Sequence, residues 1–380
     1  MKLAIIHFLP LEYYPPITNL LDYLVNYPSN KFEKIKVFST TNNKKRKNYQ
    51  FPIQLPHKSI RRTPFPNEKN NSISRIIKYL KFNLQTLILL TFLKPDKILY
   101  FESYSAWPVY VYARYINRKV RIFIHNHEYS SKDWYQNTMK QVRYFHKLER
   151  KWLYPKAVWN SQTNPDRLDF FHRDHPYLNK EQLRVMPNYP PKTWQTSTKK
   201  KINTKDSSPL KLVYVGSLSF QSTYLKEVCE WIIKQNGKIH LDIFSFNLYD
   251  DVKSYLSNLS YEFINFHEKG IEYNDIPNIL PEYDVGLIFY KAYSRNVTNC
   301  VSNKFYEYVA LGLDVWFSQV MTTTNQHTNI NSFPKVIPVD FENLDKFDWK
   351  SAASHEGLQH KPTNFFCEDI YEELVDKIIV

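Results

Sequence analysis

Two charged side chains, Lys304 and Glu307, lie three residues apart shortly after Ser302, a residue type common at helix N-caps. In a helix that begins there, Asn303, Lys304 and Glu307 share one side. Backbone N–H groups at a helix N-terminus lack partners and bind anions, and Lys304 adds a positive charge. Glu307 can accept two hydrogen bonds from a vicinal diol. The pattern predicts a nucleoside diphosphate site, with ribose on Glu307; the alternative is that Glu307 is a solvated helix residue.

A strand, a loop and a helix would position this site. The apolar run 285–290 predicts a buried parallel strand, and the polar segment 291–298 predicts a loop. The helix is expected to end at Gly312. Its opposite side is apolar and would pack on a sheet, through Phe305, Tyr308 and Val309.

Two other turns of the same half follow predicted strands. Gly216 and Ser217 follow the apolar run 210–215, where backbone N–H groups can approach a diphosphate. Ile271 follows the strand expected at 263–267. These positions extend the predicted binding site beyond a single helix.

A polar cluster, His125-Asn126-His127-Glu128-Tyr129, follows the strand expected at 121–124. Side chains just beyond the carboxyl end of a parallel strand lie where α/β sheets bind ligands. Three roles remain open for this cluster: contact with a donor or acceptor, structural hydrogen bonding, or metal binding. The spacing matches no known zinc pattern, and no third ligand is evident.

The stretch 276–315 resembles the donor-binding segment of GT-B glycosyltransferases, especially the large retaining family four. The resemblance rests on three motifs: LPEYDVGL at 280–287, NKFYEY at 303–308 and GLDV at 312–315. In the first half of the chain, the cluster at 125–129 resembles the family's Tyr-Asp-x-His-Glu segment.

Within that segment His127 and Glu128 match the family's His-Glu, and His125 stands where the family has Asp. Asn299 occupies a position where family four often carries a second Glu, so this chain has no carboxylate there. The family often has a basic residue soon after the first turn of the donor domain, and 220–225 contains none.

The resemblance implies transfer of a sugar from a nucleotide-diphosphate sugar to a glycan or lipid-linked acceptor, with retention of configuration. It fits bacterial surface polysaccharide or glycoconjugate synthesis. The catalytic residues would be His127, Glu128 and Lys304. The donor-binding residues would be Glu307, Asn303, Asn299, Gly216, Ser217, Ile271, Tyr290 and Ser302. No Asp-x-Asp motif ends a plausible strand, so we expect no metal and no other required cofactor.

Strands alternate with helices through all 380 residues, which predicts an α/β fold with parallel sheets. The resemblance implies two Rossmann-like domains facing a central cleft. The expected boundaries are an N-terminal acceptor domain at 1–195, a linker at 196–208 and a C-terminal donor domain at 209–380. We expect a long loop at 40–71, a helix at 74–92, a helix at 135–153 and a terminal helix at 368–379.

The charge is divided unequally along the chain. Residues 1–200 contain 35 Lys and Arg against 13 Asp and Glu, whereas residues 201–380 contain 16 against 24. A basic half indicates an anionic partner, and we expect an anionic membrane surface. The alternative is that the charge serves solubility alone. No apolar run reaches the length of a spanning helix.

Three sparse cysteines predict no disulfide framework and suit a reducing cytoplasm. The expected location is therefore cytoplasmic, at the inner face of the membrane. Two other functions remain as alternatives. One is a nucleotide-sugar epimerase of the same fold. The other is a nucleic-acid-binding protein that uses the basic half, although no nucleic-acid-binding motif is present.

Overall fold

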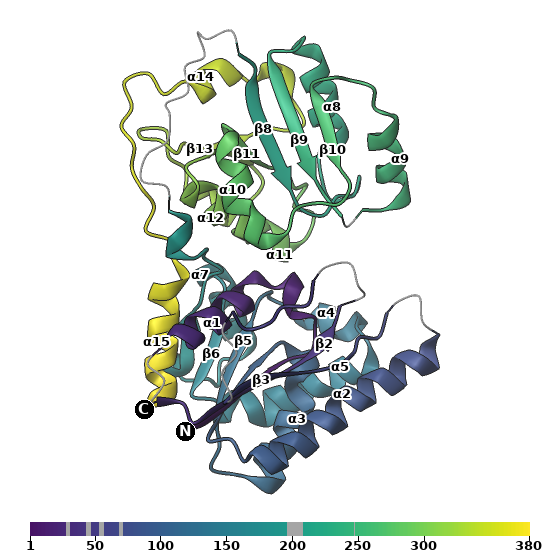
Figure 1. Ribbon diagram of the computed structural model, residues 1–380, viewed down its shortest axis with the longest axis vertical. Helices are drawn as coiled ribbons and strands as arrows, with labels where there is room; N and C mark the ends of the chain where they lie inside the picture. The colour runs from purple at the N-terminus through teal and green to yellow at the C-terminus, as the bar shows by residue number, and fades with distance from the viewer. Residues whose placement is uncertain (28–30, 43–46, 53–56, 68–70, 196–207, 247) are drawn as a thin grey trace. The chain divides into compact units, whose positions relative to one another are not determined.

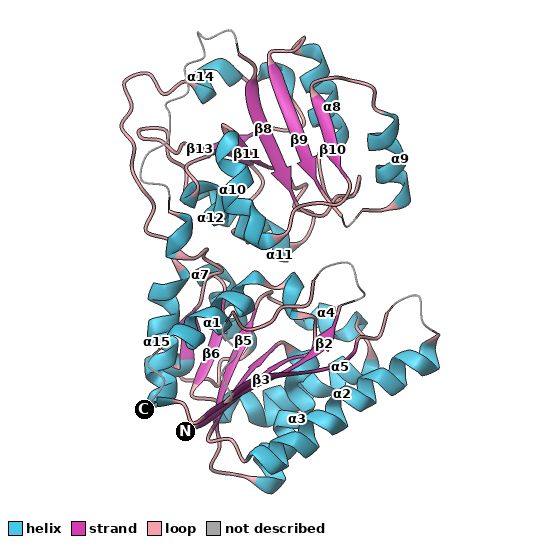
Figure 2. Cartoon of the chain, viewed as in Figure 1, coloured by secondary structure: helices cyan, strands magenta, loops and turns pink. Residues whose placement is uncertain are grey.

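The computed structural model describes residues 1–380 except 28–30, 43–46, 53–56, 68–70, 196–207 and 247. The chain forms two compact units (Figure 1). The first comprises Met1–Asn188 and Cys367–Val380, and the second comprises Tyr189–Phe366. The second unit is therefore inserted between two parts of the first. Figure 2 shows that both units combine a sheet with helices.

The first unit contains a seven-stranded parallel sheet. Its strands are β1 Lys2–His7, β2 Lys34–Thr41, β3 Lys58–Pro64, β4 Lys97–Phe101, β5 Arg121–Asn126, β6 Trp159–Gln162 and β7 Leu183–Val185. Their order in the sheet is β3-β2-β1-β4-β5-β6-β7. The central strands are buried almost completely, as expected for a parallel sheet with helices on both faces.

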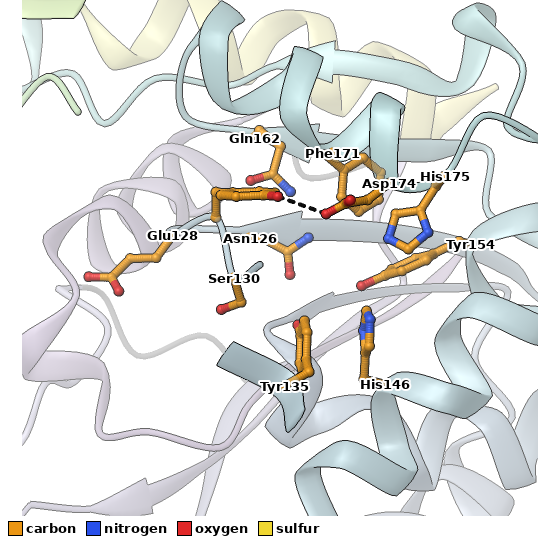
Figure 3. A pocket seen from close by; sticks show the side chains of 11 residues that line it. Asn126, Glu128, Ser130, Tyr135, His146, Tyr154, Gln162, Phe171, Asp174 and His175 are labelled. Atoms are coloured by element: carbon orange, nitrogen blue, oxygen red, sulfur yellow. Dashed lines mark hydrogen bonds between the residues drawn. The ribbon is translucent and has the colours of Figure 1, made fainter. Parts of the chain in front are cut away.

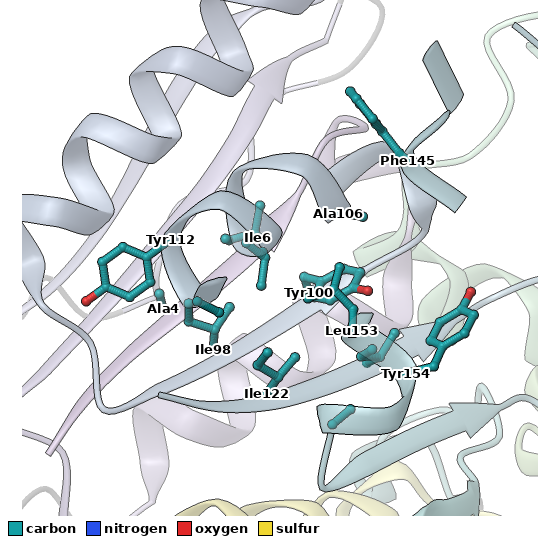
Figure 4. Packing of buried hydrophobic residues seen from close by; sticks show 14 of the residues in the cluster. Ala4, Ile6, Ile98, Tyr100, Ala106, Tyr112, Ile122, Phe145, Leu153 and Tyr154 are labelled. Carbon is teal, nitrogen blue, oxygen red and sulfur yellow. The ribbon is translucent and has the colours of Figure 1, made fainter. Parts of the chain in front are cut away.

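Three helices of this unit lie side by side over one face of the sheet: α2 Ser72–Leu93, α3 Ala106–Val111 and α5 Lys140–Leu148. Figure 4 shows the core beneath them, where Ile6, Ile98 and Ile122 from neighbouring strands meet Ala106 and Phe145 from the helices. Two π-helical turns continue this layer, η4 Tyr112–Ile116 and η5 Glu149–Leu153. Three further helices complete the layer, α4 Lys132–Asn137, α6 Tyr154–Lys156 and α7 Pro165–Asp174.

The opposite face is covered by α1 Pro15–Asn26 and α15 Cys367–Ile379. The right-handed crossover from β1 to β2 runs in the opposite direction to the crossover from β4 to β5, so α1 lies across the sheet from α3. α1 and α15 contact each other, and the Tyr371 hydroxyl donates to the Pro16 carbonyl at 2.6 Å.

The second unit contains a six-stranded parallel sheet in the order β10-β9-β8-β11-β12-β13. Its strands are β8 Leu210–Val215, β9 Ile239–Phe244, β10 Ile264–His267, β11 Val285–Ile288, β12 Asp314–Ser318 and β13 Val336–Val339. Its helices are α8 Leu225–Lys234, α9 Asp250–Asn258, α10 Ile276–Ile279, α11 Arg295–Thr298, α12 Asn303–Ala310, α13 Thr322–Asn325 and α14 Trp349–Ala353. The predicted α/β class is confirmed in both units.

Two predicted elements of the first unit were wrong. The segment 40–71 is not a long loop, because β3 pairs with β2 along its whole length. Its sequence, KSIRRTP, is basic and mostly polar because β3 is an edge strand with exposed positions, so it lacks the apolar signal of a buried strand. The helix expected at 135–153 is divided into α4 and α5, because the chain is extended at Thr138.

Two domain boundaries also differ from the prediction. The terminal helix, assigned to a second domain at 209–380, belongs to the first unit as α15. The first unit ends at Asn188 rather than at 195, because Tyr189 onward packs with the second unit. The predicted linker at 196–208 lies almost entirely outside the described residues, as does most of the basic run 44–47.

Candidate functional site

The second unit has a topological switch point between β8 and β11. These strands are neighbours, yet the chain passes from β8 to β9 on one side and from β11 to β12 on the other. Ligands of open α/β sheets bind at the carboxyl ends of the strands at such a point. Gly216 and Ser217 follow β8, and Tyr290 follows β11. The structure thus brings these three predicted residues to one place.

Backbone hydrogen bonds join the two loops that leave this switch point. Tyr224 N–H donates to the Phe289 carbonyl at 3.0 Å, and Lys291 N–H donates to the Ser222 carbonyl at 2.9 Å. The Tyr214 hydroxyl donates to the Ser217 carbonyl at 2.7 Å. The turn after β8 is therefore fixed against the segment that leads from β11 toward α12.

Helix α12 carries the predicted charged pair. The Ser302 hydroxyl accepts a hydrogen bond from Lys304 N–H at 3.3 Å, as expected for an N-cap. Lys304 Nζ lies 2.7 Å from Glu307 Oε2, so the two side chains do share one side of the helix. Glu307 is only 2% exposed, which rules out the solvated alternative. A buried carboxylate with a partly exposed lysine beside it is an uncommon arrangement in a helix.

The position of α12 depends on a glycine of β11. The Tyr308 ring lies over Gly286, where an added Cβ would come within 2.2 Å of the ring. The Tyr308 hydroxyl accepts from Val215 N–H, at the end of β8, at 3.2 Å. Burial raises the pKa of Tyr308 well above its usual value, so it stays protonated. This tyrosine therefore anchors the helix to both strands of the switch point.

Tyr290 lies between the turn after β8 and the start of α12. Burial raises its pKa, and a hydrogen bond with Ser302 partly offsets the increase. The neutral phenol therefore contacts the residue that caps α12. Tyr290 thereby connects the predicted helix N-terminus to the loop side of the site.

Two predicted donor residues have structural partners of their own. Asn299 Nδ2 donates to the Arg295 carbonyl at 3.0 Å, and its Oδ1 accepts from the Thr322 hydroxyl at 3.2 Å. The Ile271 side chain is buried in the core with Val215 and Phe244. The Ile271 side chain therefore contributes to the core of the second unit and not to a ligand-binding surface.

Sequence reasoning missed one cation at this site, Lys291. Its Nζ lies 3.1 Å from Glu227 Oε1 and over the Tyr224 ring. The signal was available, because Lys291 comes directly after the apolar run of β11, whereas the family resemblance indicated a basic residue only in 220–225. Lys226 has its Nζ 4.3 Å from the centroid of the Phe220 ring.

The first unit has its own switch point, between β1 and β4. His7, Phe101 and His125 lie side by side across β1, β4 and β5, at or near their carboxyl ends. His127 stacks on Phe101, with ring centroids 5.3 Å apart, and also contacts Tyr14. Three histidines, of which only His127 was assigned a role from the sequence, therefore gather at the edge where a ligand is expected.

These histidines are buried, and burial lowers the pKa of each: well below the usual value for His7 and His125, and to about 3 for His127. All three imidazoles are therefore neutral at physiological pH. Both ring nitrogens of His7 and Nε2 of His125 have no hydrogen-bond partner within the described residues. No group of His, Cys, Asp or Glu in the described part of the chain has the geometry to hold a metal ion.

Glu102 is a second residue that sequence reasoning missed. It directly follows β4 and has a φ of 62°, which is unusual for a residue with a side chain. This conformation lets its Oε1 accept from His127 N–H at 2.6 Å. Burial, together with the nearby Glu128, raises the pKa of Glu102 to about 8. The available signal was its place just beyond a strand, the same signal that identified His127 and Glu128.

A pocket adjoins this edge, at the ends of β5 and β6 (Figure 3). Asn126 and Gln162 lie at its base, and the Tyr129 hydroxyl donates to Asp174 at 2.7 Å. Glu128 also lines it. The lining is mostly polar and aromatic, and the space inside is about enough for one water molecule. The remaining lining residues are Tyr129, Ser130, Tyr135, His146, Tyr154, Phe171, Asp174 and His175.

A buried carboxylate, Glu149, supports the wall of this pocket. Its two oxygens accept hydrogen bonds from the Tyr100 hydroxyl at 2.8 Å, from the Tyr154 hydroxyl at 3.3 Å and from Ser103. Glu149 is fully buried. Because its partners come from β4, the turn after it and α6, this network holds the helical layer against the sheet.

No protein-family model and no curated protein matches the sequence. Solved structures do match its fold. Sucrose-phosphate synthase from Thermosynechococcus elongatus is 12% identical with a TM-score of 0.65, over 100% of this chain and 98% of that one. Anabaena HepE, solved in complex with UDP and glucose, is 11% identical with a TM-score of 0.60, over 100% and 99%. A putative UDP-N-acetylglucosamine 2-epimerase from Listeria monocytogenes is 12% identical with a TM-score of 0.60, over 99% and 95%.

The fold class is therefore established: two Rossmann-like units with parallel sheets, as in GT-B proteins. The similar structures include both glycosyltransferases and epimerases. At these identities the similarity shows the fold alone, so the reaction must be argued from the residues of this chain.

Proposed function

We propose that this protein is a glycosyltransferase that moves a sugar from a nucleotide-diphosphate sugar to a glycan or lipid-linked acceptor. The observation that carries the proposal is the buried Glu307 beside Lys304 on α12, at the switch point of the second unit. This helix lies within the segment whose sequence resembles the donor-binding segment of family four.

The donor half of the proposal follows from the charges on α12. Lys304 and the N-terminus capped by Ser302 would stabilise the diphosphate, which becomes the leaving group. Glu307 would accept hydrogen bonds from the ribose diol. Lys304 and Glu307 now neutralise each other at 2.7 Å. A bound donor would supply an anion for Lys304 and hydroxyl donors for Glu307, so neither charge would be left buried alone.

The first unit would supply the groups that contact sugar and acceptor. His127 is neutral, so its ring can donate one hydrogen bond and accept another. Glu128 would contact acceptor hydroxyls. Retention of configuration and a role in bacterial surface polysaccharide synthesis are parts of the proposal that rest on the family resemblance. Independence of a metal rests on the absence of an Asp-x-Asp motif at the end of a plausible strand.

The direct test is a donor screen. Nucleoside diphosphates and their sugar conjugates are added separately, with and without EDTA, and thermal unfolding is measured. A ligand at one hundred times its Kd stabilises by roughly 2.7 kcal/mol, which raises the melting temperature measurably. We expect one nucleotide and its sugar conjugate to stabilise the protein in both conditions. Lack of stabilisation by every nucleotide would refute the proposal.

An epimerase is the second candidate, and a specific observation favours it. Glu102 has a pKa of about 8 and lies against the segment that carries Glu128. Epimerisation requires removal and return of a proton, for which such carboxyl groups are suited. The stabilising nucleotide sugar is incubated in D2O without an acceptor. Deuterium on the sugar ring would indicate epimerisation, whereas an unlabelled donor would favour transfer.

A further inference from the structure

Helix α2 exposes a continuous apolar surface. Its inner side packs in the core through Tyr79, Phe82 and Leu90. Its outer side carries large apolar residues that are each about half exposed or more, up to 79% for Phe92. They recur every third or fourth position, so they form one stripe along about 29 Å of helix. The stripe consists of Ile73, Ile76, Ile77, Leu80, Leu84, Ile88 and Phe92.

Contrary to the expectation from the sequence, length and composition alone would allow α2 to span a membrane, and it is the one helix in the described part of the chain that passes this test. The packing argues against spanning, because its inner side covers β3 and contacts α3. Seven large apolar residues on a single helix nevertheless form an unusual outer surface for a water-soluble domain. The stripe therefore needs a partner.

The charges around the stripe identify the chemistry of that partner. The neighbouring segments of the same helical layer are 72–93, 106–116 and 140–156. They contain ten basic residues and a single acidic one, Glu149, which is fully buried. The basic residues are Arg75, Lys78, Lys81, Arg114, Lys140, Arg143, Lys147, Arg150, Lys151 and Lys156. Within these segments no acidic side chain reaches the surface.

Aromatic residues lie among these charges. Tyr115 and Tyr144 are more than half exposed, and the charged ends of Arg114 and Lys156 lie over the Trp152 ring. Tyrosine and tryptophan are enriched where a protein meets the headgroup region of a bilayer. These three segments therefore combine an aliphatic stripe, an aromatic fringe and a positive surround. The other acidic residues of the same helical layer lie on α4 and α7, at Asp133, Asp166, Asp169 and Asp174.

We propose that this surface docks on an anionic lipid bilayer, with the stripe of α2 among the headgroups and the basic residues on lipid phosphates. The inference does not depend on the reaction proposed above. A two-fold dimer through the same surface would place ten cations opposite ten cations, which is unfavourable. A nucleic acid would leave the aliphatic stripe uncovered.

The geometry also determines the orientation of α2. A helix with one side in the protein core and the other apolar lies parallel to the bilayer plane, immersed to about 5–10 Å. Lys78 and Lys81 flank the stripe on the same helix, within reach of lipid phosphates. A soluble glycosyltransferase held in this way would work beside a lipid-linked acceptor.

The test is sedimentation of the full-length protein with vesicles. One set contains phosphatidylcholine alone, and the other contains phosphatidylcholine mixed with phosphatidylglycerol, each at low and high salt. We expect binding to the anionic vesicles that weakens with salt, and little binding to the neutral ones. Equal binding to both sets, or no binding at low salt, would overturn the proposal.

Two variant pairs locate the surface. The triple variant Ile77→Glu, Leu84→Glu, Ile88→Glu should weaken vesicle binding more than tenfold. The matched control, Tyr249→Glu with Ile330→Glu, changes exposed apolar residues of the second unit and should not. Lys78→Gln with Lys81→Gln should weaken binding about fivefold for each charge, whereas Lys211→Gln with Lys238→Gln in the second unit should have little effect.

The remaining outcomes of these experiments either support or refute the binding of the α2 surface to a bilayer. All variants change exposed or partly exposed side chains, and their melting curves should match the wild type, which shows that they fold. Unchanged vesicle binding by the folded triple variant would refute the role of α2. Concentration-dependent dimers that this variant abolishes, in place of vesicle binding, would assign the surface to a second copy. Salt-sensitive oligonucleotide binding without vesicle binding would assign it to a nucleic acid.

Discussion

The switch points of the two units are assembled in different ways. In the second unit, the charged pair Lys304 and Glu307 comes from a single helix and is three residues apart in sequence. In the first unit, His7, Glu102 and His127 come from three separate segments that only the sheet brings together. A local pair leaves a motif in the sequence, whereas a site gathered from several strands leaves only single polar residues. The first kind is recognised from sequence, and the second requires the fold.

The largest expected effect tests the local pair. Glu307→Gln keeps the volume of the side chain but removes the charge that we assign to the ribose. A charge-assisted hydrogen bond contributes roughly 1.5–3 kcal/mol, so we expect nucleotide affinity to fall by about tenfold or more. Isothermal titration with the nucleotide found in the donor screen measures this change.

A surface ion pair of the same unit provides the control for Glu307. Asp345 pairs with Lys234 at 2.8 Å, and both side chains are well exposed. Asp345→Asn should leave nucleotide affinity unchanged. If Glu307→Gln also leaves it unchanged, the charged pair is a structural feature of α12 and the donor assignment fails.

The next effect concerns how β11 holds that pair in place. Gly286→Ala would put a Cβ against the Tyr308 ring and push α12 away from the sheet. Overpacking a buried site costs about 1–3 kcal/mol, so we expect a lower melting temperature and weaker nucleotide binding. At Gly216 an added Cβ would meet only the end of the Tyr214 side chain, at 3.1 Å. Gly216→Ala should therefore lower the melting temperature less than Gly286→Ala. An equal decrease in melting temperature for both variants would contradict the role of Gly286 in positioning α12.

A pH series tests the site gathered from several strands. The Glu102 carboxyl stays protonated in the folded protein up to a pKa of about 8, whereas it ionises near 4.5 when unfolded. The unfolded state thus loses a proton that the folded state keeps, and the stability from this group declines between these two pH values. Glu102→Gln mimics the neutral form and should lack that decline.

The expected result is that the free energy of unfolding of Glu102→Gln rises relative to that of the wild type from pH 5 to pH 8, by an amount on the order of a few kcal/mol. The difference in melting temperature between the two proteins should grow in parallel. A constant difference would mean that Glu102 ionises normally and is not the buried acid described above. Glu373→Gln provides the control, because that carboxylate is exposed in its pair with Arg184.

The smallest effect concerns Asn299, which stands where family four often has a glutamate. If its amide contacts the donor sugar, Asn299→Ala should weaken binding of the sugar nucleotide about fivefold more than binding of the nucleoside diphosphate, since a neutral hydrogen bond contributes about 1 kcal/mol. Thr322→Val removes the hydrogen bond between these two residues, together with the one that the Thr322 hydroxyl donates to the Thr298 carbonyl. If Asn299→Ala and Thr322→Val weaken binding of the sugar nucleotide and of the nucleoside diphosphate to the same extent, Asn299 has only a structural role.

Much of the fold could be predicted from the sequence, because the strands of both sheets are short apolar runs and the longer helices repeat every third or fourth residue. β3 could not, since an edge strand with exposed side chains has no such run. Glu102 follows β4 directly, and this position was the available signal, but the position alone does not report the backbone conformation that brings its carboxylate to His127 N–H. The place of α15 was missed because nothing in a helix sequence states which unit it joins.

The return of α15 to the first unit also has a consequence for how the protein is made on the ribosome. A helix covering one face of the first sheet emerges only after about 180 further residues have been translated. At roughly 5–20 residues per second, this delay is on the order of 10 to 35 seconds. During that time the surface that α15 will cover stays open to water. The inserted unit has no such wait, since all its strands and helices come from one continuous segment, so it can complete its folding before the unit that was begun earlier.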